Sequence, residues 1–178
     1  MKINSLLTFA IVLLAQTVAL LAEQENAEPN KVPTKRVAFA QSCFWTGEMK
    51  LGQIEGVVRT EAGYFKGREV TVVHYAPERV ALEELAHQAK RAGVADTVYL
   101  DADSPQTVAG ISSGPALDRT YRAAPADDQK KQIQGTSFSR LQLTPEQATK
   151  VNAFARENTN KAMVWLTPAQ REQLKGGR

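Results

Sequence analysis

The pattern of apolar and polar residues divides the chain into an apolar N-terminal segment, a short polar stretch and a longer region of mixed character. Within the longer region, alternation of apolar and polar residues indicates strands, and apolar residues three or four positions apart indicate helices. Four segments rich in β-branched and aromatic residues have strand character, namely 36–41, 57–64, 69–75 and 96–100.

Two helices are expected between these strands. Residues 43–54 carry apolar side chains at helical spacing, and Ser42 just before them is a good N-cap residue. Residues 80–92 show the same spacing and end at Gly93. The resulting order β-α-β-β-α-β predicts an α+β fold, a two-layer split βαβ (ferredoxin-like) sandwich of a sheet against helices.

Additional helices are expected near the C-terminus. Thr144-Pro145-Glu146-Gln147 has the residues of a capping box with proline at the first helical position, and this helix should run to about Asn158. Thr167-Pro168-Ala169-Gln170 repeats the pattern and should open a short helix that ends at Gly176. Trp165 is expected to lie in the core of this region. Residues 101–126, interrupted by proline and glycine, are expected to be mostly loop.

The N-terminal segment predicts the destination of the protein. Residues 1–22 have the pattern of a secretory signal peptide, because Lys2 precedes an apolar run that is short for a membrane span and ends near small residues. An uncleaved membrane anchor is the alternative. Residues 23–34 are expected to be a flexible leader, and residues 35–178 a single domain. The protein should therefore be exported, to the periplasm or the extracellular space, without stable membrane insertion after the signal is removed.

Charge and composition exclude several classes of function. The 22 basic and 19 acidic residues are dispersed and aromatic residues make up 7% of the chain, so binding to nucleic acid is not indicated. The sequence has one cysteine, Cys43, and two histidines. These counts exclude an intramolecular disulfide and disfavour a zinc site, so neither a metal nor a cofactor is expected.

The position of Cys43 suggests chemistry. A thiol is a nucleophile only as the thiolate, and the N-terminus of a helix stabilises that anion. Phe44 and Trp45 follow directly and can form a rim that holds a small apolar group, such as a methyl, against the sulfur. A buried, inert cysteine with two aromatic residues packed in the core is the alternative.

A longer run of residues around Cys43 resembles a known family. Ser42-Cys43-Phe44-Trp45, Gly47-Glu48, Gly56-Val57 and Thr60-Glu61-Ala62-Gly63-Tyr64 are similar to motifs of the peptide methionine sulfoxide reductases of type A. The segment from Gly67 to Pro77 keeps a glutamate, Glu69, at the family's distance from a tyrosine and a proline, although a longer loop of the family is missing. The resemblance covers about residues 36–90.

The resemblance implies an activity and a role for each site residue. Cys43 would attack the sulfur of methionine S-sulfoxide, while Phe44 and Trp45 hold its S-methyl group. Glu69 would protonate the sulfoxide oxygen, which is a poor leaving group without a proton, and Tyr64 would donate a hydrogen bond to it. With no second cysteine, the resulting sulfenic acid would need an external thiol, either a thioredoxin-like protein or a small thiol. The substrate would be methionine sulfoxide, free or in oxidised proteins, so the function would be protein repair under oxidative stress.

The sequence departs from the family at several positions. Ser42 replaces a glycine, and Ile133 and Phe138 stand where an acid and a hydroxyl are expected. Tyr121 is a candidate for supplying a hydroxyl from another direction. These departures leave two alternatives: a catalytically impaired, reductase-like protein that senses oxidants or binds methionine sulfoxide, and a structural envelope protein with an inert cysteine.

Overall fold

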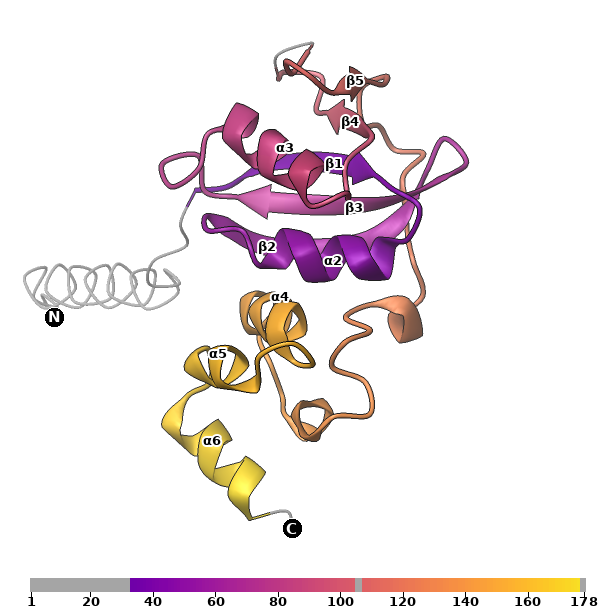
Figure 1. The fold of residues 1–178 in the computed structure, drawn as a ribbon. Helices are drawn as coiled ribbons and strands as arrows, with labels where there is room; N and C mark the ends of the chain where they lie inside the picture. The colour runs from indigo at the N-terminus through magenta and orange to yellow at the C-terminus, as the bar shows by residue number, and fades with distance from the viewer. Residues whose placement is uncertain (1–32, 105–106, 177–178) are drawn as a thin grey trace, which may run out of the picture. The chain divides into compact units, whose positions relative to one another are not determined.

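The computed structural model describes residues 33–104 and 107–176, which belong to one compact unit (Figure 1). The expected signal peptide, 1–22, and all but the last two residues of the expected leader, 23–34, lie outside the described residues. No helix in the described part of the chain combines the length and apolar character needed to cross a membrane.

A six-stranded sheet in the order β5-β4-β1-β3-β2-β6 forms the centre of this unit. Strand β1 pairs antiparallel with both β3 and β4, and β2 pairs antiparallel with β3. Strands β1 and β2 are therefore parallel and separated by β3, which is the split βαβ arrangement. The α+β prediction is confirmed, and the four predicted strands are present to within one residue at each end: β1 (Lys35–Ala40), β2 (Val57–Phe65), β3 (Arg68–Tyr75) and β4 (Thr97–Leu100).

One face of the sheet is covered by the helices α2 (Phe44–Gly52) and α3 (Leu82–Arg91) (Figure 1). Side chains that alternate along the central strands point to this face and pack against the apolar sides of both helices. The cluster is fully or almost fully buried and includes Val37, Phe39, Leu51, Val73, Leu85 and Val98. This core holds α2 against the sheet and so positions the N-terminus of α2, where Cys43 lies.

The segment between β4 and the C-terminal helices covers part of the other face, and it is more ordered than expected. It contributes β5 (Ser112–Ser113), parallel to β4, and β6 (Arg122–Ala123), antiparallel to β2, at opposite edges of the sheet. Between these strands Leu117 is buried against the second face and Tyr121 packs beside it. The described part of this segment is mostly loop, as predicted, and the two short strands are the exceptions, because pairing with the existing sheet edges orders residues that have no strand pattern of their own.

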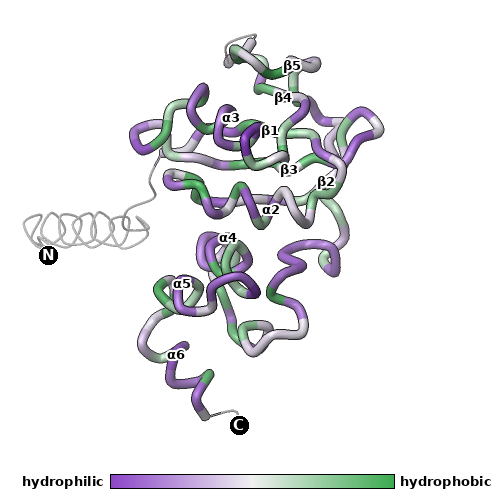
Figure 2. The backbone as a smooth tube through the Cα atoms, viewed as in Figure 1, coloured by the Kyte–Doolittle hydropathy of each residue, from purple (hydrophilic) through white to green (hydrophobic). Residues whose placement is uncertain are grey.

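The remaining helices are α4 (Pro145–Phe154), α5 (Thr159–Val164) and α6 (Pro168–Lys175). They form a separate apolar cluster with the 3₁₀ turn Ser137–Arg140, whereas an earlier 3₁₀ turn, Ala126–Asp128, has no buried residue. Both predicted capping boxes are present, at Thr144 and at Thr167. Helix α6 carries mostly hydrophilic residues (Figure 2).

Two expectations in this region were wrong. Helix α4 ends at Phe154, before the predicted Asn158, because Asn158 caps a new helix: its side chain accepts a hydrogen bond from the backbone N–H of Lys161. Trp165 is 38% exposed and is not a core residue. Its ring faces the ammonium group of Lys150 at 5.4 Å, which places it at the edge of the packing between α4 and α5.

Candidate active site

Cys43 is the N-cap residue of α2. Its backbone is extended, with φ −149° and ψ 112°, and its carbonyl accepts a hydrogen bond from the N–H of Gly47 at 3.0 Å. The N-cap prediction for Ser42 was wrong by one residue, because the chain stays extended after β1: Gln41 still donates its backbone N–H to the carbonyl of Glu69. Cys43 is partly exposed, its side chain makes no capping hydrogen bond, and it lies at the positive end of the helix.

The first turn of α2 receives its cap from another strand. Oε2 of Glu69, the second residue of β3, accepts a hydrogen bond from the backbone N–H of Phe44 at 2.8 Å. A carboxylate at this position satisfies one unpaired donor of the helix and interacts favourably with its dipole. The contact places the Glu69 carboxylate beside the residue that follows Cys43.

The aromatic residues gather around the same point. Tyr64 lies directly opposite Glu69 in the β2–β3 pairing, so both side chains are on the same face of the sheet. The ring of Phe44 is buried and meets the ring of Tyr64 edge to face, with 5.4 Å between centroids. The ring centroids of Trp45 and Phe44 are 6.1 Å apart, and Trp45 and Tyr64 are each 36% exposed. The fold thus brings together the five residues predicted from the sequence, and their roles remain predictions.

The ring of Trp45 is covered by the side chain of a lysine, Lys131. The ammonium group of Lys131 lies 4.8 Å from the centroid of the Trp45 ring, within the range of a cation–π interaction. Lys131 also donates a hydrogen bond to the carbonyl of Asp127 at 3.0 Å and lies 3.7 Å from the carboxylate of Asp128. These contacts fix an exposed aromatic ring at the rim of the site.

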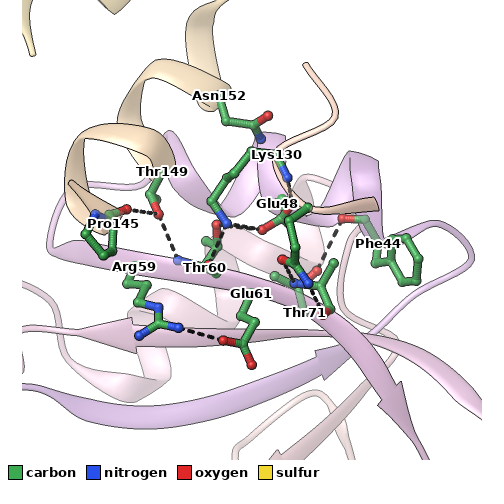
Figure 3. A network of polar contacts seen from close by, with 12 residues as sticks. Phe44, Glu48, Arg59, Thr60, Glu61, Thr71, Lys130, Pro145, Thr149 and Asn152 are labelled. Carbon is green, nitrogen blue, oxygen red and sulfur yellow. Dashed lines mark hydrogen bonds and ion pairs between the residues drawn. The ribbon is translucent and has the colours of Figure 1, made fainter. Parts of the chain in front are cut away.

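A buried charge pair, Glu48 and Lys130, supports helix α2 (Figure 3). Glu48, one turn after Phe44, is fully buried, and its carboxylate accepts hydrogen bonds from the backbone N–H of Lys130 at 2.7 Å and from the Lys130 ammonium group. The same ammonium group donates to the carbonyl of Thr60 at 2.7 Å. The Glu48–Lys130 pair therefore joins α2, β2 and the segment before α4. Glu48 belongs to the motif recognised in the sequence, but the sequence does not show its partner 82 residues away.

The other end of α2 is also fixed by a residue from a distant element. The buried ammonium group of Lys150, on α4, donates hydrogen bonds to the carbonyls of Gly52 at 2.9 Å and Ile54 at 3.0 Å. Burial lowers the pKa of Lys150 to about 8. Helix α2 is thus stabilised by an anion at its start and a cation at its end, as its dipole favours.

Tyr121 does not reach this site. Its hydroxyl donates a hydrogen bond to Oε1 of Glu61 at 2.7 Å, on the face of the sheet opposite to Tyr64. Burial and the neighbouring Glu61 carboxylate raise the pKa of Tyr121. Ile133 and Phe138 are buried in the C-terminal apolar cluster. Tyr64 is therefore the tyrosine next to Glu69 in the part of the chain that the structure describes.

The described residues contain no group of three or more histidine, cysteine, aspartate or glutamate side chains arranged to hold a metal ion. The side chains near the N-terminus of α2 include one thiol, one carboxylate and one phenol, from Cys43, Glu69 and Tyr64. Such a set is suited to nucleophilic attack by sulfur with proton transfer from an acid.

Comparison with known proteins finds relatives that are named peptide methionine sulfoxide reductases, although no family model matches the chain. The chain is 31% identical over 107 residues to peptide methionine sulfoxide reductase MsrA 1 of Rhizobium meliloti (strain 1021), which covers 51% of this chain and 44% of the relative. It is 35% identical over 68 residues to peptide methionine sulfoxide reductase MsrA of Clostridium perfringens (strain SM101 / Type A), which covers 29% and 43%. The chain resembles the type A methionine sulfoxide reductases.

This finding confirms the resemblance identified from the motif. The matches span less than half the length of these curated relatives. Methionine sulfoxide reductase A of Corynebacterium diphtheriae is a solved structure with a TM-score of 0.49 and 15% sequence identity, over 67% of this chain and 81% of that chain.

Proposed function

We propose that this protein is a thiol-dependent peptide-methionine (S)-S-oxide reductase in which Cys43 is the nucleophile. The Cys43 thiolate attacks the sulfur of the sulfoxide and forms a sulfur–sulfur bond, while the sulfoxide oxygen takes a proton from Glu69. The resulting hydroxyl group passes to the Cys43 sulfur, the sulfur–oxygen and sulfur–sulfur bonds of the substrate break, and the substrate leaves as a thioether. The substrate is reduced by two electrons and Cys43 is oxidised to the sulfenic acid. An external dithiol then returns Cys43 to the thiol, with release of water and formation of a disulfide in the reductant.

The observation that supports this proposal is the position of the Glu69 carboxylate. Oε2 is bound to the N–H of Phe44, beside Cys43, and no other described group bonds to Oε1. Protonated Oε1, together with the hydroxyl of the opposite residue Tyr64, can therefore donate to a sulfoxide oxygen whose sulfur lies at Cys43. The rings of Phe44 and Trp45 supply an apolar wall for the S-methyl group.

The test is an assay of both sulfoxide epimers with excess dithiothreitol. We expect the wild-type protein to reduce methionine S-sulfoxide and to leave the R epimer unchanged, and we expect Cys43→Ser to abolish the reaction. Ser42→Ala is the matched control, because it alters the neighbouring hydroxyl and leaves the thiol in place. A wild-type protein whose thiol is alkylated readily but which reduces neither epimer would refute the proposal.

A second candidate function is oxidant sensing or methionine sulfoxide binding without turnover. The contact that favours it is the Tyr121–Glu61 hydrogen bond, which holds a second phenol away from Glu69. Mass spectrometry after treatment with peroxide distinguishes the two candidates. A Cys43 sulfenic acid that forms with peroxide, in a protein that reduces no sulfoxide, supports sensing.

We also propose that the protein acts outside the cytoplasm, on methionine sulfoxide in exported proteins or free in that compartment. The proposal rests on the signal-peptide pattern of residues 1–22. N-terminal sequencing of the protein recovered from the periplasm or the medium should find a new terminus near Glu23. Recovery of the full-length chain in the cytoplasmic fraction would contradict it.

A further inference from the structure

Three residues from neighbouring strands form a row across one face of the sheet. Glu69 on β3 lies opposite Tyr64 on β2, and Tyr64 lies opposite Arg122 on β6. Because directly opposite residues project to the same face, the Arg122 side chain belongs to the face that carries the candidate active site. Strand β6 has two residues, so this row exists only because the segment after β5 returns to pair with β2.

An open cavity of about 450 Å³ adjoins this row. It is lined by Tyr64, Phe65, Lys66, Gly67, Thr120 and Arg122. Tyr64 is thus shared between the cavity and the aromatic cluster around Cys43, since its ring also contacts Phe44. A substrate whose sulfoxide lies at Glu69 and Tyr64 would extend into this cavity.

The two cations of the cavity differ in their partners. The ammonium group of Lys66 is paired with the carboxylate of Asp118 at 3.2 Å. Asp118 is itself held by hydrogen bonds from the N–H and hydroxyl of Thr120. The backbone of Arg122 pairs with β2, but its exposed side chain makes no hydrogen bond or ion pair with any residue that the structure describes. Its guanidinium is therefore available to an anion from outside the chain, and its planar donor array matches a carboxylate.

We propose that Arg122 is a specificity-determining residue that binds a carboxylate of the substrate. This inference rests on the proposed reductase function. The carboxylate has two possible sources: the α-carboxylate of free or C-terminal methionine sulfoxide, or the side chain of an acidic residue next to methionine sulfoxide in a peptide. Neighbouring strands are about 4.8 Å apart, so Arg122 lies about 10 Å across the sheet from Glu69. Because the arginine side chain is long, its guanidinium can reach substrate groups that are a few bonds away from the sulfoxide.

The binding experiment uses ligands that differ only in charge. N-acetyl-methionine S-sulfoxide is compared with its C-terminal amide, and the peptide N-acetyl-Met(O)-Glu-amide with N-acetyl-Met(O)-Gln-amide. Dissociation constants are measured calorimetrically on Cys43→Ser, which cannot turn the ligands over. We expect the charged member of at least one pair to bind about threefold to tenfold more tightly, the range of a partly exposed ion pair. The first pair reports the α-carboxylate and the second the acidic side chain.

The same measurements are repeated with Arg122→Gln added, and with Arg119→Gln as the control. Arg119 is an exposed arginine three residues earlier in the same segment and is not among the residues that line the cavity. We expect Arg122→Gln to remove the preference for the charged ligand and to leave the affinity for the neutral ligand within about twofold, whereas Arg119→Gln retains the preference.

The inference is overturned if charged and neutral ligands bind equally well to the Arg122 protein, or if Arg122→Gln keeps the preference. These results are separate from those that decide catalysis. A wild-type protein that reduces S-sulfoxides without regard to charge contradicts the role of Arg122 alone. A protein that prefers the carboxylate ligands through Arg122 but reduces none of them contradicts the proposed reductase activity alone.

Discussion

The carboxylate of Glu69 accepts a hydrogen bond from the backbone N–H of Phe44 at 2.8 Å. This contact joins the start of β3 to the first turn of α2, one residue after Cys43. The carboxylate caps the helix, and under the proposed mechanism the same side chain would also protonate the substrate oxygen. Substitutions that keep the cap and remove the acid can separate these tasks.

Glu69→Gln is the substitution that does so. The amide oxygen still accepts from Phe44, so we expect the free energy of unfolding to change by less than about 1 kcal/mol. The amide cannot deliver a proton, so reduction of S-sulfoxide should slow about 10²- to 10⁴-fold. Urea denaturation and single-turnover kinetics measure the two effects. An unchanged rate would show that Glu69 is only a helix cap.

The buried Glu48–Lys130 pair should be important for stability. Lys130→Met leaves the fully buried Glu48 carboxylate without its counter-charge, and we expect the free energy of unfolding to fall by about 3–5 kcal/mol. Glu48→Gln should cost less, because the Lys130 side chain is 16% exposed and can reach water. The double variant should lose less than the sum of the single losses in a denaturant double-mutant cycle. Additive losses would mean that the two groups do not interact.

Gly63 is required by the approach of the segment that ends in β6. A Cβ at this position would lie 2.4 Å from Cε2 of Tyr121 and 2.7 Å from the carbonyl oxygen of Arg122. We expect Gly63→Ala to lower the free energy of unfolding by about 1–3 kcal/mol, because both neighbours must shift. In a Tyr121→Ala background the added cost should be smaller, since one clash is gone. An equal cost in both backgrounds would contradict this explanation.

The lowered pKa of Lys150 predicts that the stability of the protein depends on pH. Its pKa is about 8 in the folded protein and ordinarily 10.5, so between these values the unfolded chain binds a proton that the folded protein does not. The free energy of unfolding contributed by Lys150 therefore rises with pH across this window. Measured by denaturation at pH 7.5 and pH 11, the stability of the wild type relative to Lys150→Met should increase by about 3 kcal/mol. A constant difference would show that Lys150 keeps its ordinary pKa.

The features that the sequence predicted correctly depend on neighbouring residues. The alternation in β1 to β4 and the helical spacing in α3 place apolar side chains on one side of each element, whichever partner covers them. The capping boxes at Thr144 and Thr167 are closed by residues three positions away, and both form. The order of these elements was sufficient for the α+β class and the split βαβ arrangement.

The features that the sequence did not reveal are contacts between distant residues. Strands β5 and β6 form because existing strand edges offer unpaired backbone groups, and their own residues carry no such pattern. Oε1 of Glu61 accepts a hydrogen bond from the hydroxyl of Tyr121 on the face of the sheet opposite to Tyr64. No spacing of residues along the chain indicates this contact.

The sequence by itself determined the strands β1 to β4 and the helices α2, α3, α4 and α6. It also showed that the chain has a single thiol at a strand-to-helix junction, and which family its motif resembles. Local periodicity, capping and residue identity are properties of short segments, so they can be determined from the sequence without the fold. The tertiary structure alone decided that Glu69 caps the helix of Cys43, that Glu48 and Lys150 hold that helix in place, and that Arg122 shares a face with Tyr64. Each of these depends on strand register and packing over 25 to 98 positions, which only the folded chain brings into contact.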